Sequence, residues 1–225
     1  SAAVNTSVEL AKLFKRGQAS GLVNAVLRKI SQNKEALPAI PDRDPARQRS
    51  IRYCHPRWLG TRLMALLGRE ETEAFLAADN GVAPLTVQVN PLKTTPEALT
   101  AKLAEAGVTA RPHPWVPGCL ERSGTGDWTA LEALRAGDFV VQDPAARLVS
   151  AFAEVRPGQR VLDVCAAPGG KSFSAAFAME DRGTILACDL HENKLKRIRE
   201  GADRLGLTCI ETEAADGRTP HPDWV

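Results

Sequence analysis

Several features that would place this chain in a broad class of proteins are absent from its 225 residues. No apolar stretch approaches the ~18–20 residues needed to cross a bilayer, and the first residues lack the pattern of a secretory signal. No segment is repeated, and no tract has low complexity. The composition, 44% hydrophobic and 25% charged, is typical of a soluble globular protein, which we expect to be cytoplasmic and not bound to a membrane.

The cysteines form neither a disulfide framework nor a metal site. They are odd in number, scattered and without metal-ligand spacing: Cys54, Cys119, Cys165, Cys188 and Cys209. Reduced thiols in a cytosolic protein are the simplest interpretation, and we expect no metal. Cys188 and Cys209 fall in predicted strands and are expected to be small core residues.

The small net charge of +2 conceals an asymmetry along the chain. Residues 1–69 carry 13 Lys and Arg against 4 Asp and Glu, a net of +9, whereas residues 70–225 carry 16 against 23, a net of −7. A basic front half favours an anionic partner, in particular a nucleic acid. A solvated basic helical surface explains the charge alone equally well.

The first 80 residues are predicted to be mostly helical. Apolar residues recur at helical spacing within 3–31, prolines and alternating charges indicate a loop or linker over 37–47, and helices are expected from Pro56 to Gly68 and from 70 to 79. The start Ser1-Ala2-Ala3 resembles an interior cut.

A small β-α-β pattern follows. Alternating apolar residues predict a strand over 85–89, and Thr95-Pro96 begins a helix that Gly107 ends. Short strands are expected at 108–111 and 119–122, and a helix at 128–136.

The last third alternates between strands and helices, which predicts a parallel, doubly wound sheet. After a strand at 139–141 and a helix from Pro144, the expected elements are strand 160–164, helix 172–180, strand 184–188, helix 192–205 and strand 209–213.

The most informative segment is the loop 165–171, Cys-Ala-Ala-Pro-Gly-Gly-Lys, which joins a strand to a helix. Its glycines allow backbone to approach a ligand, and the first N–H groups of the helix point at it. The G-x-G-x-x-G fingerprint is absent, and Pro168 removes a donor that a pyrophosphate would use. S-adenosylmethionine, which has no pyrophosphate, fits better than a nicotinamide dinucleotide. An ordinary tight turn at Gly169-Gly170 is the structural alternative.

Two carboxylates follow the next two strands. Asp189 lies about 20 residues past the glycines, where a carboxylate can accept hydrogen bonds from a ribose diol. Asp216 follows the third strand and could contact the adenine amine. Alternatively, Asp189 caps the next helix and Asp216 forms a turn before Gly217.

Two residues of the loop invite a chemical role. Lys171 places a cation at a helix N-terminus, against the helix dipole, so a contact to substrate or cofactor would explain it; an exposed, tolerated lysine is the alternative. Cys165 could be an activated thiolate, but no Cys–His pair is evident, and we expect it to offer backbone to the cofactor.

These residues resemble a known family. Leu162 to Lys171 is similar to the cofactor motif of the RNA 5-methylcytosine methyltransferases, the Nol1/Nop2/Sun group, and Val140-Val141-Gln142-Asp143 resembles the segment that leads into that domain. Gly21 to Arg28 is similar to the last helical part of the NusB-like domain in the bacterial 16S ribosomal-RNA branch, the RsmB/Sun/Fmu-like branch. The resemblance runs along essentially the whole chain.

The resemblance implies S-adenosylmethionine-dependent methylation of cytosine carbon 5 in ribosomal RNA, with one cysteine adding to carbon 6 and a second assisting release. The family carries them in Asp-Ala-Pro-Cys and Thr-Cys-Ser motifs beyond the third strand, and neither motif occurs here. We therefore expect a fragment, truncated at both ends and inactive alone, with its catalytic residues beyond Val225 and none within the chain. The alternatives are a non-catalytic RNA-binding module with a relic cofactor loop, and a nicotinamide-dependent oxidoreductase.

The predicted fold class is α/β: an incomplete Rossmann-like methyltransferase domain over 144–225, preceded by a helical NusB-like remnant over 1–50 and by a helical linker with a small α+β domain over 51–143. We expect a monomer that binds 16S ribosomal RNA. The residues expected to bind the cofactor are Cys165, Ala166, Ala167, Pro168, Gly169, Gly170, Lys171, Asp189 and Asp216.

Overall fold

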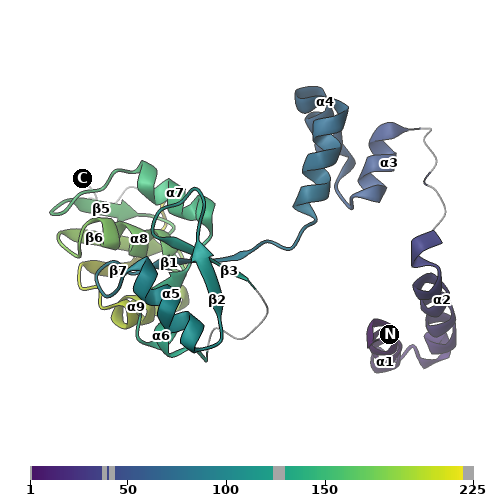
Figure 1. Cartoon of the computed structure of the whole chain (residues 1–225), viewed down its shortest axis with the longest axis horizontal. Helices are drawn as coiled ribbons and strands as arrows, with labels where there is room; N and C mark the ends of the chain where they lie inside the picture. The colour runs from purple at the N-terminus through teal and green to yellow at the C-terminus, as the bar shows by residue number, and fades with distance from the viewer. Residues whose placement is uncertain (1, 37–39, 41–43, 124–129, 220–225) are drawn as a thin grey trace. The chain divides into compact units, whose positions relative to one another are not determined.

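The computed structural model of the chain describes residues 2–36, 40, 44–123 and 130–219 (Figure 1). It divides into an N-terminal unit, residues 1–82, and a C-terminal unit, residues 83–225. The three-part division expected from the sequence stays a prediction. Among the described residues, no helix is both long enough and apolar enough to cross a membrane.

The first helices of the N-terminal unit form a short hairpin. The single helical stretch predicted over 3–31 is wrong in one respect, because Lys15 adopts a left-handed backbone (φ 56°) that ends the first helix. The elements are α1 (Ala2–Leu13), the 3₁₀ turn η1 (Gly17–Ala19), α2 (Ser20–Gln32) and the 3₁₀ turn η2 (Lys34–Ala36).

A second hairpin contains a helix that the sequence interpretation missed. α3 (Pro45–Arg52) begins inside the predicted loop 37–47, and its N-cap Asp44 accepts hydrogen bonds from the N–H groups of Ala46 and Arg47. Residues 37–39 and 41–43 of that loop lie outside the described part. α4 (Arg57–Asp79) is broken at Gly68, where φ is 78°, as expected for two successive helices.

The C-terminal unit begins with a four-stranded antiparallel sheet in the order β2-β3-β1-β4. The predicted β-α-β pattern is half of this β-α-β-β-α-β arrangement, which is ferredoxin-like. The predicted helix 128–136 is shorter, and residues 128–129 lie outside the described part. The elements are β1 (Leu85–Val89), α5 (Pro96–Glu105), β2 (Thr109–Pro112), β3 (Cys119–Ser123), α6 (Glu132–Arg135) and β4 (Phe139–Val141).

Both faces of this first sheet are covered. One face forms an apolar core in which Val87, Leu99, Leu120 and Phe139 are fully buried. The other face is polar at β1, where Thr86 and Gln88 are buried, and the Gln88 Oε1 accepts a hydrogen bond from the Ser174 hydroxyl at 2.5 Å. Ser174 belongs to the following sheet's first helix, so the two sheets share one unit.

The second sheet is parallel and has the strand order β5-β6-β7. The reversal of strand order that a doubly wound sheet needs is not among the described strands. Helix α8 begins and ends two residues earlier than predicted. The elements are α7 (Pro144–Phe152), β5 (Arg160–Asp163), α8 (Gly170–Ala178), β6 (Thr184–Asp189), α9 (Glu192–Leu205) and β7 (Ile210–Ala214).

Asn90 joins the two sheets of the C-terminal unit. It is fully buried, and its Nδ2 donates to the carbonyls of Gly137 and Leu205, both at 2.9 Å. Its Oδ1 accepts from the N–H of Leu92. The Lys93 ammonium adds a hydrogen bond to the Arg204 carbonyl at 3.0 Å. The end of α9 is thereby fixed against the first sheet, which positions the site described next.

Candidate functional site

The loop between β5 and α8 needs both of its glycines. Gly169 has φ 113°, a conformation that side chains rarely adopt, and a Cβ there would collide with the Phe173 ring. A Cβ on Gly170 would collide with the Gln142 side chain. The peptide between Ala167 and Pro168 is cis. Close packing against two side chains, beyond an ordinary tight turn, therefore determines this loop.

Hydrogen bonds tie the loop to the end of the neighbouring strand. The N–H of Ala166 donates to the Cys188 carbonyl at 2.8 Å, and the N–H of Ala167 donates to the Asp189 carboxylate at 3.2 Å. The N–H groups of the first turn of α8 have no intrahelical acceptor, because a helix leaves its first donors unpaired. The loop therefore presents backbone donors at the carboxyl end of the parallel sheet.

Asp189 is held at that edge with its charge maintained. Burial alone would raise the pKa of its carboxyl, but hydrogen bonds from the N–H groups of His191 and Ala167, with Lys194 nearby, lower it. The Lys194 ammonium lies 3.6 Å from Oδ1. Since α9 begins at Glu192 with His191 as its N-cap, Asp189 is not the cap of that helix.

Asp216 lies two residues beyond β7, and Arg218 occupies its carboxylate. The Arg218 backbone N–H donates to Oδ1 at 3.0 Å and its Nη2 donates to Oδ2 at 2.6 Å. The Arg218 guanidinium holds the pKa of the Asp216 carboxyl below its ordinary value. These contacts are those of the turn-forming alternative, and they are local.

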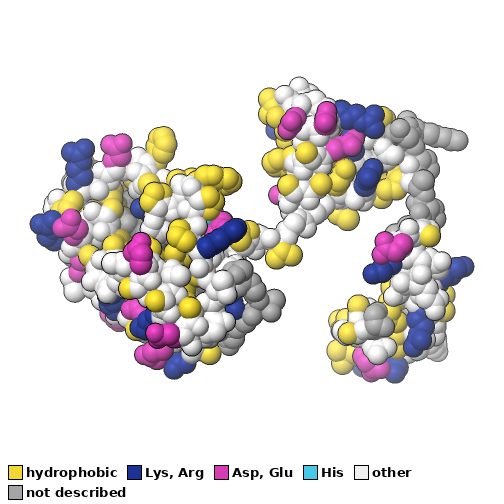
Figure 2. All heavy atoms as spheres, in the orientation of Figure 1, with side chains coloured by type: hydrophobic (Ala, Val, Ile, Leu, Met, Phe, Trp, Pro, Cys, Tyr) yellow, Lys and Arg dark blue, Asp and Glu magenta, His cyan; other side chains and the backbone are white. Residues whose placement is uncertain are grey.

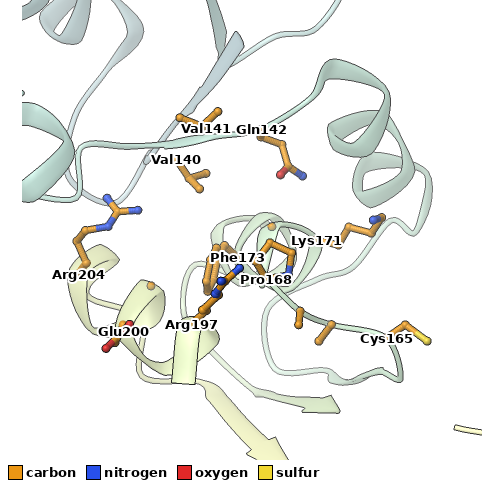
Figure 3. Close-up of a pocket in the computed structure, with 14 residues that line it drawn as sticks. Val140, Val141, Gln142, Cys165, Pro168, Lys171, Phe173, Arg197, Glu200 and Arg204 are labelled. Carbon is orange, nitrogen blue, oxygen red and sulfur yellow. The ribbon is translucent and has the colours of Figure 1, made fainter. Parts of the chain in front are cut away.

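The two chemically suggestive loop residues point in different directions. Lys171 lies in the first turn of α8, and its side chain lines a cavity (Figure 3). Cys165 is exposed, its backbone N–H donates to Asp163 at 3.3 Å, and its thiol points away from the other cavity residues in Figure 3. No hydrogen bond joins Cys165 to a histidine in the described part of the chain.

The catalytic cysteines were expected beyond Val225, the last residue of the sequence. Residues 220–225 lie outside the described part of the structure, so this expectation stays a prediction. The other cysteine at the ligand-holding edge, Cys188, is buried, and burial raises the pKa of its thiol. Neither it nor Cys165 has the surroundings of an activated nucleophile, which agrees with a catalytic thiolate supplied from elsewhere.

The cavity beside the loop has a volume of about 450 Å³ and is bounded by β4, the loop, α8 and α9. It collects most of the predicted loop residues but not Gly169, Asp189 or Asp216. Its lining residues are Val140, Val141, Gln142, Cys165, Ala166, Ala167, Pro168, Gly170, Lys171, Phe173, Arg197, Glu200, Gly201 and Arg204.

The polar wall of this cavity escaped the sequence interpretation. Arg197, Gly201 and Arg204 recur at helical spacing on α9, opposite the buried Leu195 and Ile198. That spacing was a usable signal for a second functional face of the helix. The placement of Gln142 opposite Gly170 depends on tertiary packing and has no local signal.

Three known families match separate parts of the chain. Residues 1–32 match the NusB family, and residues 55–125 match the ferredoxin-like domain of the RsmF/B-like methyltransferases. Residues 151–225, which contain the loop and both carboxylates, match the family described as 16S rRNA methyltransferase RsmB/F. The order of the three matches follows the order of the elements described above.

Curated relatives match nearly the whole chain. Ribosomal RNA small subunit methyltransferase B of Pseudomonas putida is 38% identical over 99% of this chain and 50% of its own length. The probable enzyme of the same name from Bacillus subtilis is 32% identical over 96% of this chain and 48% of its own length. The chain therefore spans about half the length of the curated relatives it matches.

Solved structures share the fold. The crystal structure of PH0851 is 27% identical and superposes with a TM-score of 0.78 over 94% of this chain and 46% of that one. The structure of NSun6 from Pyrococcus horikoshii with SFG, 18% identical, covers 72% of this chain and 66% of that one with a TM-score of 0.65. From its loop motif, its strand and helix order, and these matches, we conclude that the chain belongs to the RsmB/F family of methyltransferases.

Proposed function

We propose that this chain is part of an enzyme that transfers a methyl group from S-adenosylmethionine to carbon 5 of a cytosine in ribosomal RNA. The observation that carries the proposal is the hydrogen bond from the Ala167 N–H to Asp189, which joins the glycine loop and the strand-end carboxylate into one ligand-holding edge. The names of the curated relatives support ribosomal RNA of the small subunit, the 16S RNA, as the substrate.

The residues at this edge fit S-adenosylmethionine better than a dinucleotide. Asp189 keeps a charged carboxylate beside the loop, as a ribose diol requires. The loop offers few free backbone donors, because the N–H groups of Ala166, Ala167 and Gly169 are already bonded and Pro168 has none. A pyrophosphate would lack partners here. When bound, S-adenosylmethionine supplies an activated methyl group.

The chain's own residues would bind and orient the donor. Asp189 accepts the ribose hydroxyls, the backbone of 165–169 lies against the donor, and the first N–H groups of α8 face its carboxylate. Asp216 contacts the adenine amine through a carboxylate oxygen already oriented by Arg218. Cys165 contributes backbone and leaves its thiol unused.

The N-terminal unit is the proposed RNA-binding part, in a protein that we place in the cytoplasm. Not every cation there is available: Arg49 is buried against Glu73 at 2.9 Å, and Arg57 pairs with Asp44 at 2.9 Å. Arg62 and Arg52 make no ion pair within the described residues and are exposed. Figure 2 shows Lys and Arg side chains on both hairpins of this unit. Such cations bind phosphates irrespective of sequence.

Two binding measurements on the protein in its natural length test the proposal. Calorimetry should detect S-adenosylmethionine and no nicotinamide dinucleotide, and RNA affinity should fall steeply with salt, with a log–log slope of several units. Tritiated methyl transfer to undermodified ribosomal RNA then reads the reaction. RNA binding without donor binding would favour the non-catalytic module, and dinucleotide binding would favour the oxidoreductase.

A further inference from the structure

The cavity beside the loop contains a buried donor without a partner. The Gln142 side chain is 7% exposed, and its Nε2 makes no hydrogen bond to any described residue. In Figure 3 its amide points toward Pro168 and Lys171, across the cavity from α9. A buried amide without an acceptor costs free energy, about 1–3 kcal/mol, unless a ligand or water completes it. This site therefore requires an acceptor.

Cations surround that donor. Lys171, Arg197 and Arg204 all line the cavity, against one carboxylate, Glu200. Arg204 is anchored, since its Nη1 donates to the carbonyls of Leu134 and Phe139. Glu200 lies 3.6 Å from the exposed Lys196, and in Figure 3 its carboxylate points away from the cavity. Lys171 and Arg197 have no hydrogen-bonding or ion-pairing partner among the described residues, so their charges remain available.

This cavity is distinct from the place proposed for the methyl donor's nucleoside. Neither Asp189 nor Asp216 lines it. S-adenosylmethionine bears a sulfonium and an ammonium against one carboxylate, so a wall of three cations repels it. A phosphodiester carries one negative charge and only acceptor oxygens, which match one amide donor and two available cations.

We propose that the cavity lined by Gln142, Lys171 and Arg197 is a phosphodiester-binding subsite for the RNA strand. Gln142 Nε2 donates to a phosphate oxygen, and Arg197 and Lys171 neutralise the charge. The subsite fixes the position of the backbone and reads no base. The inference rests on the proposed function, because it presumes that RNA is the substrate.

The test compares Arg197→Gln with Arg199→Gln in the natural-length protein. Arg199 lies on the same helix but bonds Thr212 of β7 and does not line the cavity. The probe is a fluorescein-labelled single-stranded RNA from the small-subunit RNA, measured by anisotropy. Arg197→Gln should weaken binding about five- to tenfold and reduce the salt slope by about 0.7, the value for one lost phosphate on single-stranded RNA. Arg199→Gln should change binding less than twofold.

A second variant and a second ligand sharpen the result. Gln142→Glu keeps the side-chain shape but replaces the donor with a negative acceptor, so it should weaken RNA binding more than tenfold at an unchanged melting temperature. Both variants should bind S-adenosylmethionine like the wild type. Equal RNA affinity of Arg197→Gln and Arg199→Gln, or loss of donor affinity with RNA affinity intact, would overturn the subsite. A wild-type protein that binds no RNA would instead overturn the proposed function.

Discussion

Asp189 Oδ2 accepts a hydrogen bond from the backbone N–H of Ala167 at 3.2 Å, across 22 residues of sequence. The bond makes the end of β6 part of the loop structure, and the Ala166 N–H bond to Cys188 reinforces it one residue away. A ligand on this edge therefore meets a loop whose conformation is already held by the carboxylate that would bind it.

Replacing Asp189 with alanine should weaken S-adenosylmethionine binding by about 10- to 100-fold, the equivalent of ~1.5–3 kcal/mol for a hydrogen bond to a charged group. Calorimetry measures it. Because the hydrogen bonds and Lys194 outweigh burial and lower the carboxyl pKa, binding should persist at neutral pH and fail only as pH drops through that lowered pKa. Unchanged affinity in Asp189→Ala would contradict the assignment.

Thiol labelling should divide the five cysteines into two classes. Cys54 and Cys165 are exposed and should react at pH 8 within minutes, whereas the other three react only in denaturant. Burial raises the pKa of the Cys119 and Cys188 thiols, and burial with the adjacent Asp181 raises that of Cys209 to about 12.

Cys165→Ser should remove one fast-reacting thiol and leave donor affinity unchanged, because the proposed contact is through backbone. Cys54→Ser is the matched control. A Cys165→Ser protein that folds but no longer binds the donor or transfers methyl groups would show that the thiol is used.

His55 should titrate above the ordinary imidazole value of 6.5. The Asp79 carboxylate, 2.8 Å from Nε2, raises the pKa of the His55 imidazole against the opposing effect of burial, and the Tyr53 carbonyl at Nδ1 adds to the rise. The stabilisation of α3 against α4 is then complete below pH 6.5 and is lost as pH rises through the raised pKa. NMR titration of the ring protons measures this.

Asp79→Asn should return the His55 pKa toward its ordinary value, whereas Glu35→Gln, which removes an exposed charge of the same unit, should leave it in place. A titration midpoint that Asp79→Asn does not lower would refute the pairing.

Asn90→Ala should destabilise the C-terminal unit by at least about 2 kcal/mol, because it leaves two buried carbonyls and one N–H without partners. Urea unfolding followed by Trp fluorescence measures it. Asn193→Ala, an exposed position at the start of α9, is the control and should fall within about 0.5 kcal/mol of wild type. Comparable losses in both variants would argue against Asn90 as the joint.

The sequence predicted what local chemistry encodes. Alternating strands and helices, the Thr95 cap, and the glycine loop with Asp189 beyond it were all visible in the pattern of residues. α3 was missed although Asp44-Pro45 carried a helix start, because prolines on either side favoured a loop. The cavity could not be predicted, since Gln142 meets Gly170 only after two sheets have packed together.

The buried joint at Asn90 also sets a timetable for synthesis. Its partner carbonyl at Leu205 lies 115 residues later, so at ~5–20 residues per second the ribosome needs roughly 6 to 23 s to supply it. During that interval the polar face of the first sheet, with Gln88 awaiting Ser174, has only water as its partner. The first sheet is thus a waiting template, and the nascent chain closes its C-terminal unit in a single late step once α9 has been made.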